Sequence, residues 1–322
     1  MPSSDAIAFL FPGQGSQFAG MGQELAAKYP VARRTFEEAD AALGFSLSQL
    51  CFAGPEEQLK LTENTQPAIL TVSVATLRVL REKGYRCQYA AGHSLGEYSA
   101  LVAAGTLTFA DAVRTVRKRG RYMQEAVPAG QGAMAAILNL APEIVAEVCQ
   151  EASAGEVVQP ANINSAEQIV ISGHQGAVER AAALAKQRGA KRAILLPVSA
   201  PFHCPLMQPA QDRLTVDLRA LTFHDPEFPV LKNIDAEPVT TGEAAREALI
   251  LQVTGAVQWE RSMRALIASG IQYFVEIGPG EVLSGLIRRM DRTRTTCSVQ
   301  DEASLQKLST QIEVAQVEAM AT

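Results

Sequence analysis

Short apolar runs and longer segments with helical spacing alternate along this chain. Residues 6–11 and 272–277 are apolar runs followed at once by Gly and Pro, and 88–92 is a run of small residues; we read all three as buried strands. Apolar residues at helical spacing predict helices over 22–42, 66–83, 95–104, 109–126, 204–220, 243–253, 259–269 and 281–290. Strands separated by helices favour an α/β fold with a parallel sheet.

The middle of the chain has its own order of elements. It predicts, in turn, a strand at 132–138, a helix at 142–153, strands at 157–163 and 167–173, a helix at 175–189 and a strand at 191–196. The order βαββαβ is that of a ferredoxin-like unit, which can close its own sheet. We therefore expect an inserted subdomain over 128–198, and a larger discontinuous domain made of 1–127 and 199–322.

Composition narrows the class of protein. The 322 residues are 47% hydrophobic and 20% charged, with a net charge of −5, so we expect a folded protein and no general nucleic-acid binder. The five cysteines form no CxxC pair, so neither a disulfide framework nor a metal site is expected. No signal peptide and no run of 18 apolar residues is evident, which favours a cytoplasmic protein away from membranes.

Two clusters of basic residues stand out against the acidic total. Each is either a solvated helix face or a surface for a phosphate-bearing ligand or an acidic partner protein. The first comprises Arg114, Arg117, Lys118, Arg119 and Arg121, and the second Arg288, Arg289, Arg292 and Arg294.

The segment Gly92-His93-Ser94-Leu95-Gly96 fits the pattern G-x-S-x-G between an expected strand and an expected helix. In such a turn the backbone is strained, and a side chain at either glycine would collide with the neighbouring strand or helix. Backbone N–H groups at the helix start can also stabilise an oxyanion. Ser94 is thus a candidate nucleophile, although a serine at the N-cap of a helix would fit the same pattern.

A nucleophilic serine needs a base, and the chain has four histidines. His203 lies in a loop just before a helix, a common place for catalytic residues. We expect His93 to serve packing or a hydrogen bond, His174 to cap a helix, and His224 to be exposed in a loop. No acidic residue is evident as a third member of a triad, and adjacent Cys204 and His203 are poorly placed to react together.

Seven segments resemble malonyl-CoA:acyl-carrier-protein transacylases, in the order and at the spacing of that family, over about residues 5–300. They are FPGQGSQ (11–17), GHSLGEYSA (92–100), RGRYMQEA (119–126), NINSAEQIVISG (162–173), SAPFHCPLM (199–207), QVTGAVQW (252–259) and EIGPGEVLSGL (276–286). The resemblance implies an α/β-hydrolase-like large domain with an inserted ferredoxin-like small subdomain. It also implies transfer of a malonyl group from coenzyme A to the phosphopantetheine thiol of an acyl carrier protein.

The resemblance also assigns catalytic roles. Ser94 matches the nucleophile and His203 the general base, while the main-chain carbonyl of Gln252 would orient the histidine. Gln14 and Leu95 match the residues whose backbone N–H groups form the oxyanion hole. This pattern would explain why no triad carboxylate is evident.

Substrate recognition follows from the same resemblance. Arg119 matches the arginine that holds the free carboxylate of malonate, and a guanidinium suits that task because it binds a carboxylate bidentately. Leu95 resembles the residue of malonyl-selective members, and Phe202 would narrow the space for a branched acyl group. We expect malonyl-CoA and the carrier protein as partners, a monomer, and no metal or cofactor beyond the coenzyme A thioester that is the substrate.

Two other functions fit parts of the pattern. A serine hydrolase or esterase would use the same serine and histidine with water, and a non-catalytic module could bind the carrier protein alone. Within the resembled family, fatty-acid and polyketide biosynthesis both remain open, as does the role of residues 299–322, which are helical in composition.

Overall fold

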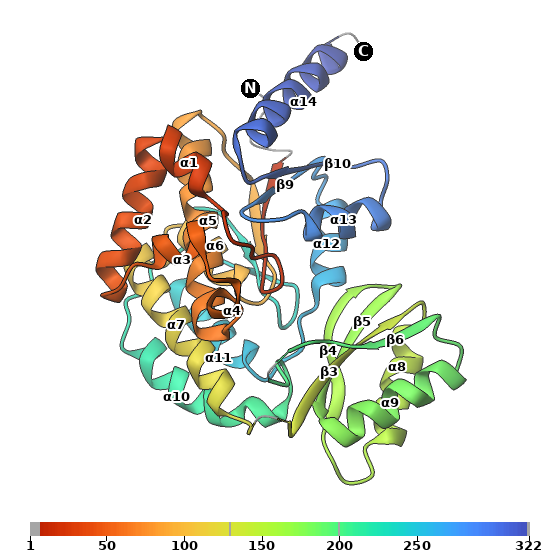
Figure 1. Ribbon diagram of the computed structural model, residues 1–322. Helices are drawn as coiled ribbons and strands as arrows, with labels where there is room; N and C mark the ends of the chain where they lie inside the picture. The colour runs from red at the N-terminus through yellow and green to blue at the C-terminus, as the bar shows by residue number, and fades with distance from the viewer. Residues whose placement is uncertain (1–6, 129, 199, 321–322) are drawn as a thin grey trace.

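The computed structural model describes residues 7–128, 130–198 and 200–320, which form two parts with one sheet each (Figure 1). Residue 6, which begins the first expected strand, and residue 199 lie outside the described residues. The limits of the two predicted domains, at 128 and 198, stay predictions.

The larger part contains a six-stranded sheet in the order β10-β9-β1-β2-β7-β8. All neighbouring strands run parallel except β7 and β8. The strands are β1 (Ile7–Phe11), β2 (Tyr89–Gly92), β7 (Val230–Leu231), β8 (Pro238–Val239), β9 (Tyr273–Ile277) and β10 (Thr295–Val299). The helices of this part are α1 (Gln23–Lys28), α2 (Pro30–Leu43), α3 (Leu47–Ala53), α4 (Glu56–Leu59), α5 (Thr62–Glu82), α6 (Gly96–Ala103), α7 (Phe109–Glu125), α10 (Gln208–Arg219), α11 (Gly242–Gln252), α12 (Trp259–Ala268), α13 (Val282–Met290) and α14 (Glu302–Met320).

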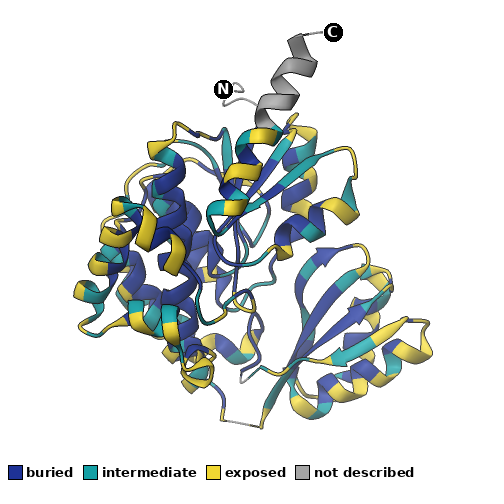
Figure 2. Ribbon diagram, turned by 45° about the horizontal axis from the view of Figure 1, so that its top comes forward, coloured by how far each residue is buried: buried dark blue, intermediate teal, exposed yellow. Residues whose placement is uncertain are grey.

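Strand β1 shows why this sheet is buried on both faces. Its five residues are all apolar and buried, as expected for a central strand of a parallel sheet. Alternate side chains point to opposite faces, so Ile7, Phe9 and Phe11 join the core with α5 and α7. Ala8 and Leu10 join the core with α12 and α13. Figure 2 shows the buried residues gathered on these inner elements.

The smaller part is a four-stranded antiparallel sheet in the order β4-β5-β3-β6, with two helices on one face (Figure 1). Its elements are β3 (Gly132–Leu138), α8 (Pro142–Ala152), β4 (Val158–Ser165), β5 (Gln168–His174), α9 (Gln175–Gln187) and β6 (Arg192–Leu195). This is the βαββαβ arrangement expected from the sequence, and the predicted α/β fold with a ferredoxin-like insert is confirmed.

Alternate side chains of β3 pack into the cores of the two different parts. Ala135 and Ile137 of β3 pack under α8 and α9 in the core of the smaller part. Met134 and Ala136 belong instead to the core of the larger part. One face of the small sheet is therefore turned toward the large domain.

Some predicted elements need correction. The single helix expected over 22–42 is wrong, because α1 ends at Lys28 and α2 begins at Pro30, with Tyr29 between them in an extended conformation. Pro30 follows it, and a residue before proline disfavours the helical conformation. Strands β7, β8 and β10 and the short helices α3 and α4 were not predicted either. Strands β7 and β8 are only two residues long, too short to show a period.

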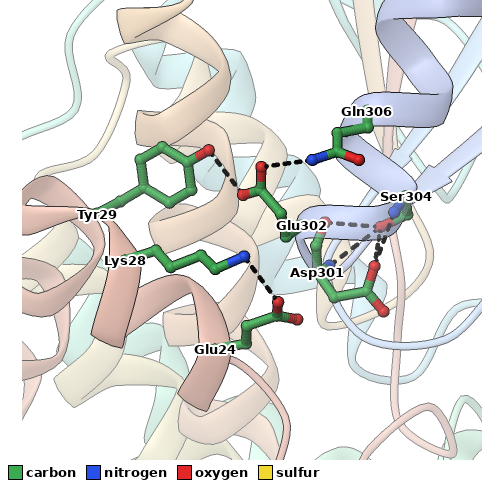
Figure 3. A network of polar contacts seen from close by, with 7 residues as sticks. All are labelled: Glu24, Lys28, Tyr29, Asp301, Glu302, Ser304 and Gln306. Atoms are coloured by element: carbon green, nitrogen blue, oxygen red, sulfur yellow. Dashed lines mark hydrogen bonds and ion pairs between the residues drawn. The ribbon is translucent and has the colours of Figure 1, made fainter.

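The start of α14 is fixed to the α1–α2 junction by a polar network (Figure 3). Tyr29 donates its hydroxyl to Glu302 Oε2 at 2.7 Å, and Gln306 Nε2 donates to the other oxygen of that carboxylate. Asp301 caps the helix by accepting the N–H of Ser304. Burial together with this carboxylate raises the pKa of Tyr29 to about 12. The beginning of the C-terminal segment is thus part of the large domain.

Candidate active site

Ser94 stands on a sharp turn between β2 and α6. Its φ is +51°, a left-handed conformation that is strained for a serine. The two flanking glycines make this turn sterically possible. A Cβ on Gly92 would lie 1.9 Å from the carbonyl of Gly96, and a Cβ on Gly96 would lie 2.1 Å from the carbonyl oxygen of Phe11. The collisions expected from the sequence are therefore present on both sides.

Replacing Gly96 with alanine should destabilise the fold by roughly 3 kcal/mol, because backbone atoms of β1 must move to admit the methyl group. A lower urea midpoint would show this. The matched control is Gly285→Ala in α13, where the nearest atom is 4.0 Å from the new Cβ. That change should be neutral or stabilising, since alanine favours helix. Equal midpoints for the two variants would contradict the steric account.

The structure brings His203 to Ser94. The distance from Ser94 Oγ to His203 Nε2 is 2.7 Å, although 109 positions separate the residues. On the other side of the ring, Nδ1 lies 2.9 Å from the carbonyl oxygen of Gln252 and 3.1 Å from that of Gly255. Carbonyl oxygens only accept, so Nδ1 carries the hydrogen and Nε2 is free to accept the serine proton.

Its surroundings keep this imidazole neutral. Burial, with the charge of Arg119 as the second cause, lowers the pKa of His203 to about 3. The residue is 2% exposed. A base that stays unprotonated is ready to accept a proton throughout the neutral range.

We expect the ring nitrogen shifts of His203 to stay constant between pH 8 and about pH 5, since its pKa lies below that range. NMR of protein labelled with ¹⁵N at histidine, assigned by loss of the signal in His203→Ala, would measure this. A titration midpoint close to the ordinary histidine pKa of about 6.5 would contradict the buried, neutral ring.

Arg119 lies at the same point as the serine and the histidine. The residue is 1% exposed. Nη2 donates to Ser94 Oγ at 3.1 Å and to Gln252 Oε1 at 2.9 Å, while Nη1 donates to Gln66 Oε1 at 2.9 Å. Of the first basic cluster, this arginine is therefore a buried member of the site. Of the others, Arg114 and Lys118 pair with Asp111 and Asp217 at the surface.

Sequence reasoning missed two residues that hold the serine turn. Asn233, 2% exposed, accepts the N–H of Ser94 at 2.6 Å and donates to the carbonyl of Gly92 at 2.7 Å. Glu97 accepts the N–H of Asn233 at 3.1 Å and is 1% exposed. An acidic residue in the otherwise apolar start of α6 is a signal that could have revealed Glu97, whereas nothing in its own sequence neighbourhood marks Asn233.

The loop after β1 borders the serine turn. A Cβ on Gly13 would lie 2.6 Å from the carbonyl oxygen of His93, so the loop and the turn are in close contact. Gln14 and Leu95 both line the cavity above Ser94, and Leu95 immediately precedes α6. The cavity has a volume of about 540 Å³ and is also lined by Arg119, His203 and Phe202.

The other candidates lie elsewhere or serve structure. His93 Nε2 lies 2.8 Å from Asn164 Oδ1 on β4, which is the hydrogen bond expected for it, and its ring contacts Trp259. His224 is exposed. His174 stands at the N-cap of α9, but its side chain makes no cap bond there; its Nδ1 accepts the N–H of Val157 instead.

The remaining polar groups offer no second reactive centre in the described chain. Cys204 points its thiol to the carbonyl of Pro201, and all five cysteines are buried and free. Within 7–128, 130–198 and 200–320, no three His, Cys, Asp or Glu side chains gather closely enough to hold a metal ion. None of the described helices combines the length and apolar character that crossing a membrane requires.

The second basic cluster lies at the surface. A shallow hollow around α13 is lined by Arg288, Arg289 and Arg292 of this cluster.

Comparison with known proteins assigns the class. Residues 8–315 match the family model described as acyl transferase domain, and the chain belongs to that family. The malonyl CoA-acyl carrier protein transacylase of Escherichia coli (strain K12) is 51% identical over 300 residues, which cover 93% of this chain and 97% of the relative. An acyl carrier protein S-malonyltransferase from Vibrio cholerae aligns with a TM-score of 0.92 at 47% identity, covering 94% of this chain and 99% of that one.

A further solved structure includes a carrier protein. It is a type II PKS acyl-carrier protein in complex with its malonyl-transacylase, and it matches with a TM-score of 0.91 at 48% identity. The match covers 93% of this chain and 97% of that chain. The resemblance drawn from the sequence segments is thereby confirmed.

Proposed function

We propose that this protein is a malonyl-CoA:acyl-carrier-protein S-malonyltransferase that works through an ester on Ser94. The observation that carries the proposal is the pair of contacts of Ser94 Oγ, 2.7 Å from His203 Nε2 and 3.1 Å from Arg119 Nη2. A general base and a guanidinium thus meet at one hydroxyl. The close relatives with malonyl transacylase names support the same activity.

In the first half-reaction, His203 Nε2 takes the Ser94 proton while Oγ attacks the thioester carbonyl carbon. The backbone N–H groups of Gln14 and Leu95 bind the developing oxyanion, and losing one such donor typically lowers the rate by about 10²–10³-fold. The carbon–sulfur bond then breaks, and the imidazolium gives its proton to the leaving thiolate of coenzyme A. In the second half-reaction the phosphopantetheine thiol gives its proton to His203 and attacks the ester, and Ser94 Oγ leaves and takes that proton back.

Arg119 would select the acyl group. A malonyl group carries its carboxylate two bonds from the reacting carbonyl carbon, so a group on Ser94 Oγ brings that carboxylate close to the guanidinium. Once Oγ is part of an ester it is a weaker hydrogen-bond acceptor than the free hydroxyl, so the Nη2 donor that now faces Oγ can turn to the carboxylate. Phe202 limits the space beside it. These steps transfer a proton and an acyl group only, so we expect no metal or redox cofactor.

A transfer assay tests the function against hydrolysis. With labelled malonyl-CoA and holo carrier protein, label should pass to the carrier protein with ping-pong kinetics. Fast release of malonate without carrier protein would identify a hydrolase instead, and absence of any acyl-enzyme would identify a docking module. Running carrier proteins of fatty-acid and polyketide systems side by side decides between the two pathways. A cytoplasmic location and a monomeric state stay predictions.

A further inference from the structure

A buried carboxylate lies directly beneath the serine turn. Glu97 occupies the first turn of α6 and is 1% exposed. No lysine or arginine of the described chain forms an ion pair with it. Carboxylates are rarely buried without a paired charge, so the groups that do contact this one need explanation.

One oxygen of Glu97 binds two different segments. Glu97 Oε2 accepts Gln252 Nε2 at 2.7 Å and the backbone N–H of Asn233 at 3.1 Å. Gln252 is at the end of α11, and Asn233 follows β7. A single atom thus joins two parts of the chain that are far apart in sequence.

The same two residues also hold the nucleophile. Asn233 Oδ1 accepts the N–H of Ser94, and Gln252 Nε2 donates to the carbonyl of Ser94 at 2.9 Å. Both backbone groups of the strained serine are therefore held by side-chain amides. Gln252 Oε1 also accepts from Arg119 Nη2 at 2.9 Å, so the same amide fixes the guanidinium.

The chemistry of a carboxylate explains why it stands at this position. An ionised carboxylate only accepts hydrogen bonds, whereas an amide can present either its oxygen or its NH₂ group. Glu97 and the carbonyl of Ser94 both accept from the NH₂ group of Gln252, and its oxygen is thereby turned to Arg119. The reversed amide would set its NH₂ group against the guanidinium, donor against donor.

We propose that Glu97 is a positioning residue for malonyl transfer, which fixes the amide of Gln252 and the backbone of Asn233 so that Ser94 and Arg119 are held in the orientation that accepts a carboxylate-bearing acyl group. This rests on the proposed function, because it takes Arg119 as the carboxylate site.

If Glu97 acted only through its charge, replacing it would change the ratio of malonyl to acetyl transfer in the opposite direction. The negative charge of Glu97 repels an incoming malonyl carboxylate. If charge were its only effect, Glu97→Gln would raise malonyl transfer relative to acetyl transfer. The positioning role predicts that this ratio falls, since the amide introduced by Glu97→Gln can set its own NH₂ group against the two donors that now share Glu97 Oε2, which would displace Gln252 and with it the partner of Arg119.

The test compares Glu97→Gln with Glu276→Gln. Glu276, on β9, is also fully buried and accepts two backbone N–H groups, from Leu283 and Ser284. Assays run at about pH 8, because burial raises the pKa of Glu97 to about 7. We expect Glu97→Gln to lower kcat/KM for malonyl-CoA by about 10- to 100-fold, and acetyl transfer clearly less, as for a small misplacement of reacting groups. Glu276→Gln should lower Tm and leave the malonyl-to-acetyl ratio unchanged.

An unchanged or increased ratio in Glu97→Gln would overturn the proposal. Should that variant not fold, Gln252→Leu removes the same link while the backbone carbonyl that holds His203 remains, and it should lower the ratio likewise; a wild-type ratio there would also overturn the proposal. Arg119→Ala distinguishes failure of the proposed function from failure of the role of Glu97. If it leaves the ratio unchanged, the proposed carboxylate site itself fails, whereas if it lowers the ratio and Glu97→Gln does not, only the role of Glu97 fails.

Discussion

Replacing Ser94 with alanine is expected to abolish the malonyl-enzyme and to lower malonyl transfer by roughly 10⁴-fold or more. The hydroxyl is the group that would form the ester, and it is the one to which both His203 and Arg119 are hydrogen-bonded. Intact mass spectrometry after mixing with malonyl-CoA would detect the adduct in the wild type. The variant should still bind malonyl-CoA, because Arg119 keeps its place.

Ser99 provides the matched control. It lies on the same helix, is fully buried, and its hydroxyl has no hydrogen-bond partner in the described chain. Ser99→Ala should therefore retain both the adduct and the transfer rate. An intact adduct in Ser94→Ala would remove this serine from the mechanism, and a loss of activity in Ser99→Ala would show that α6 tolerates no change at all.

The part of the site that could be predicted from the sequence is local. Gly92, Ser94 and Gly96 lie within five positions, so the steric needs of the turn are visible in the sequence itself. The ferredoxin-like unit was also predictable, because each of its elements is long enough to show a period and they follow one another in order. Both predictions depend on residue patterns that lie within short stretches of the chain.

The rest depends on contacts that only the folded chain creates. His203 was one of four histidines and reaches Ser94 across 109 positions. Its role as the base was assigned by the resemblance to a family and could not be read from the periodicity of the sequence. Asn233 follows a two-residue strand and acts on a serine 139 positions away. A residue of this kind leaves no mark in its own sequence neighbourhood, because its importance lies in which backbone it meets.

The site also explains why no triad carboxylate was found. The histidine is oriented by two backbone carbonyls, so its tautomer is fixed without a negative charge beside it. A carboxylate is present, but Glu97 is linked to the serine and the arginine through amides and does not contact the imidazole. Burial and the nearby charge of Arg119 keep the pKa of His203 low, while Arg119 remains positively charged and available to the substrate carboxylate.

Replacing Arg119 with alanine is expected to lower kcat/KM for malonyl-CoA by roughly 100- to 1,000-fold, as is typical for loss of one partner of a buried charge pair. Acetyl transfer should fall by about tenfold at most, because an acetyl group has no carboxylate and loses only the bond from Nη2 to Ser94 Oγ. Arg119→Lys should recover only part of the loss, since lysine keeps the charge but lacks the planar fork.

The matched control for this arginine lies on the same helix. Arg114 is exposed and pairs with Asp111 at 2.8 Å, and exposed pairs contribute about 0–1 kcal/mol, so Arg114→Ala should leave both acyl transfers close to wild type. Parallel rate measurements with malonyl-CoA and acetyl-CoA decide the matter. Equal losses for the two acyl groups in Arg119→Ala would mean that the guanidinium supports the fold or the serine, and that the malonyl carboxylate is bound by another group.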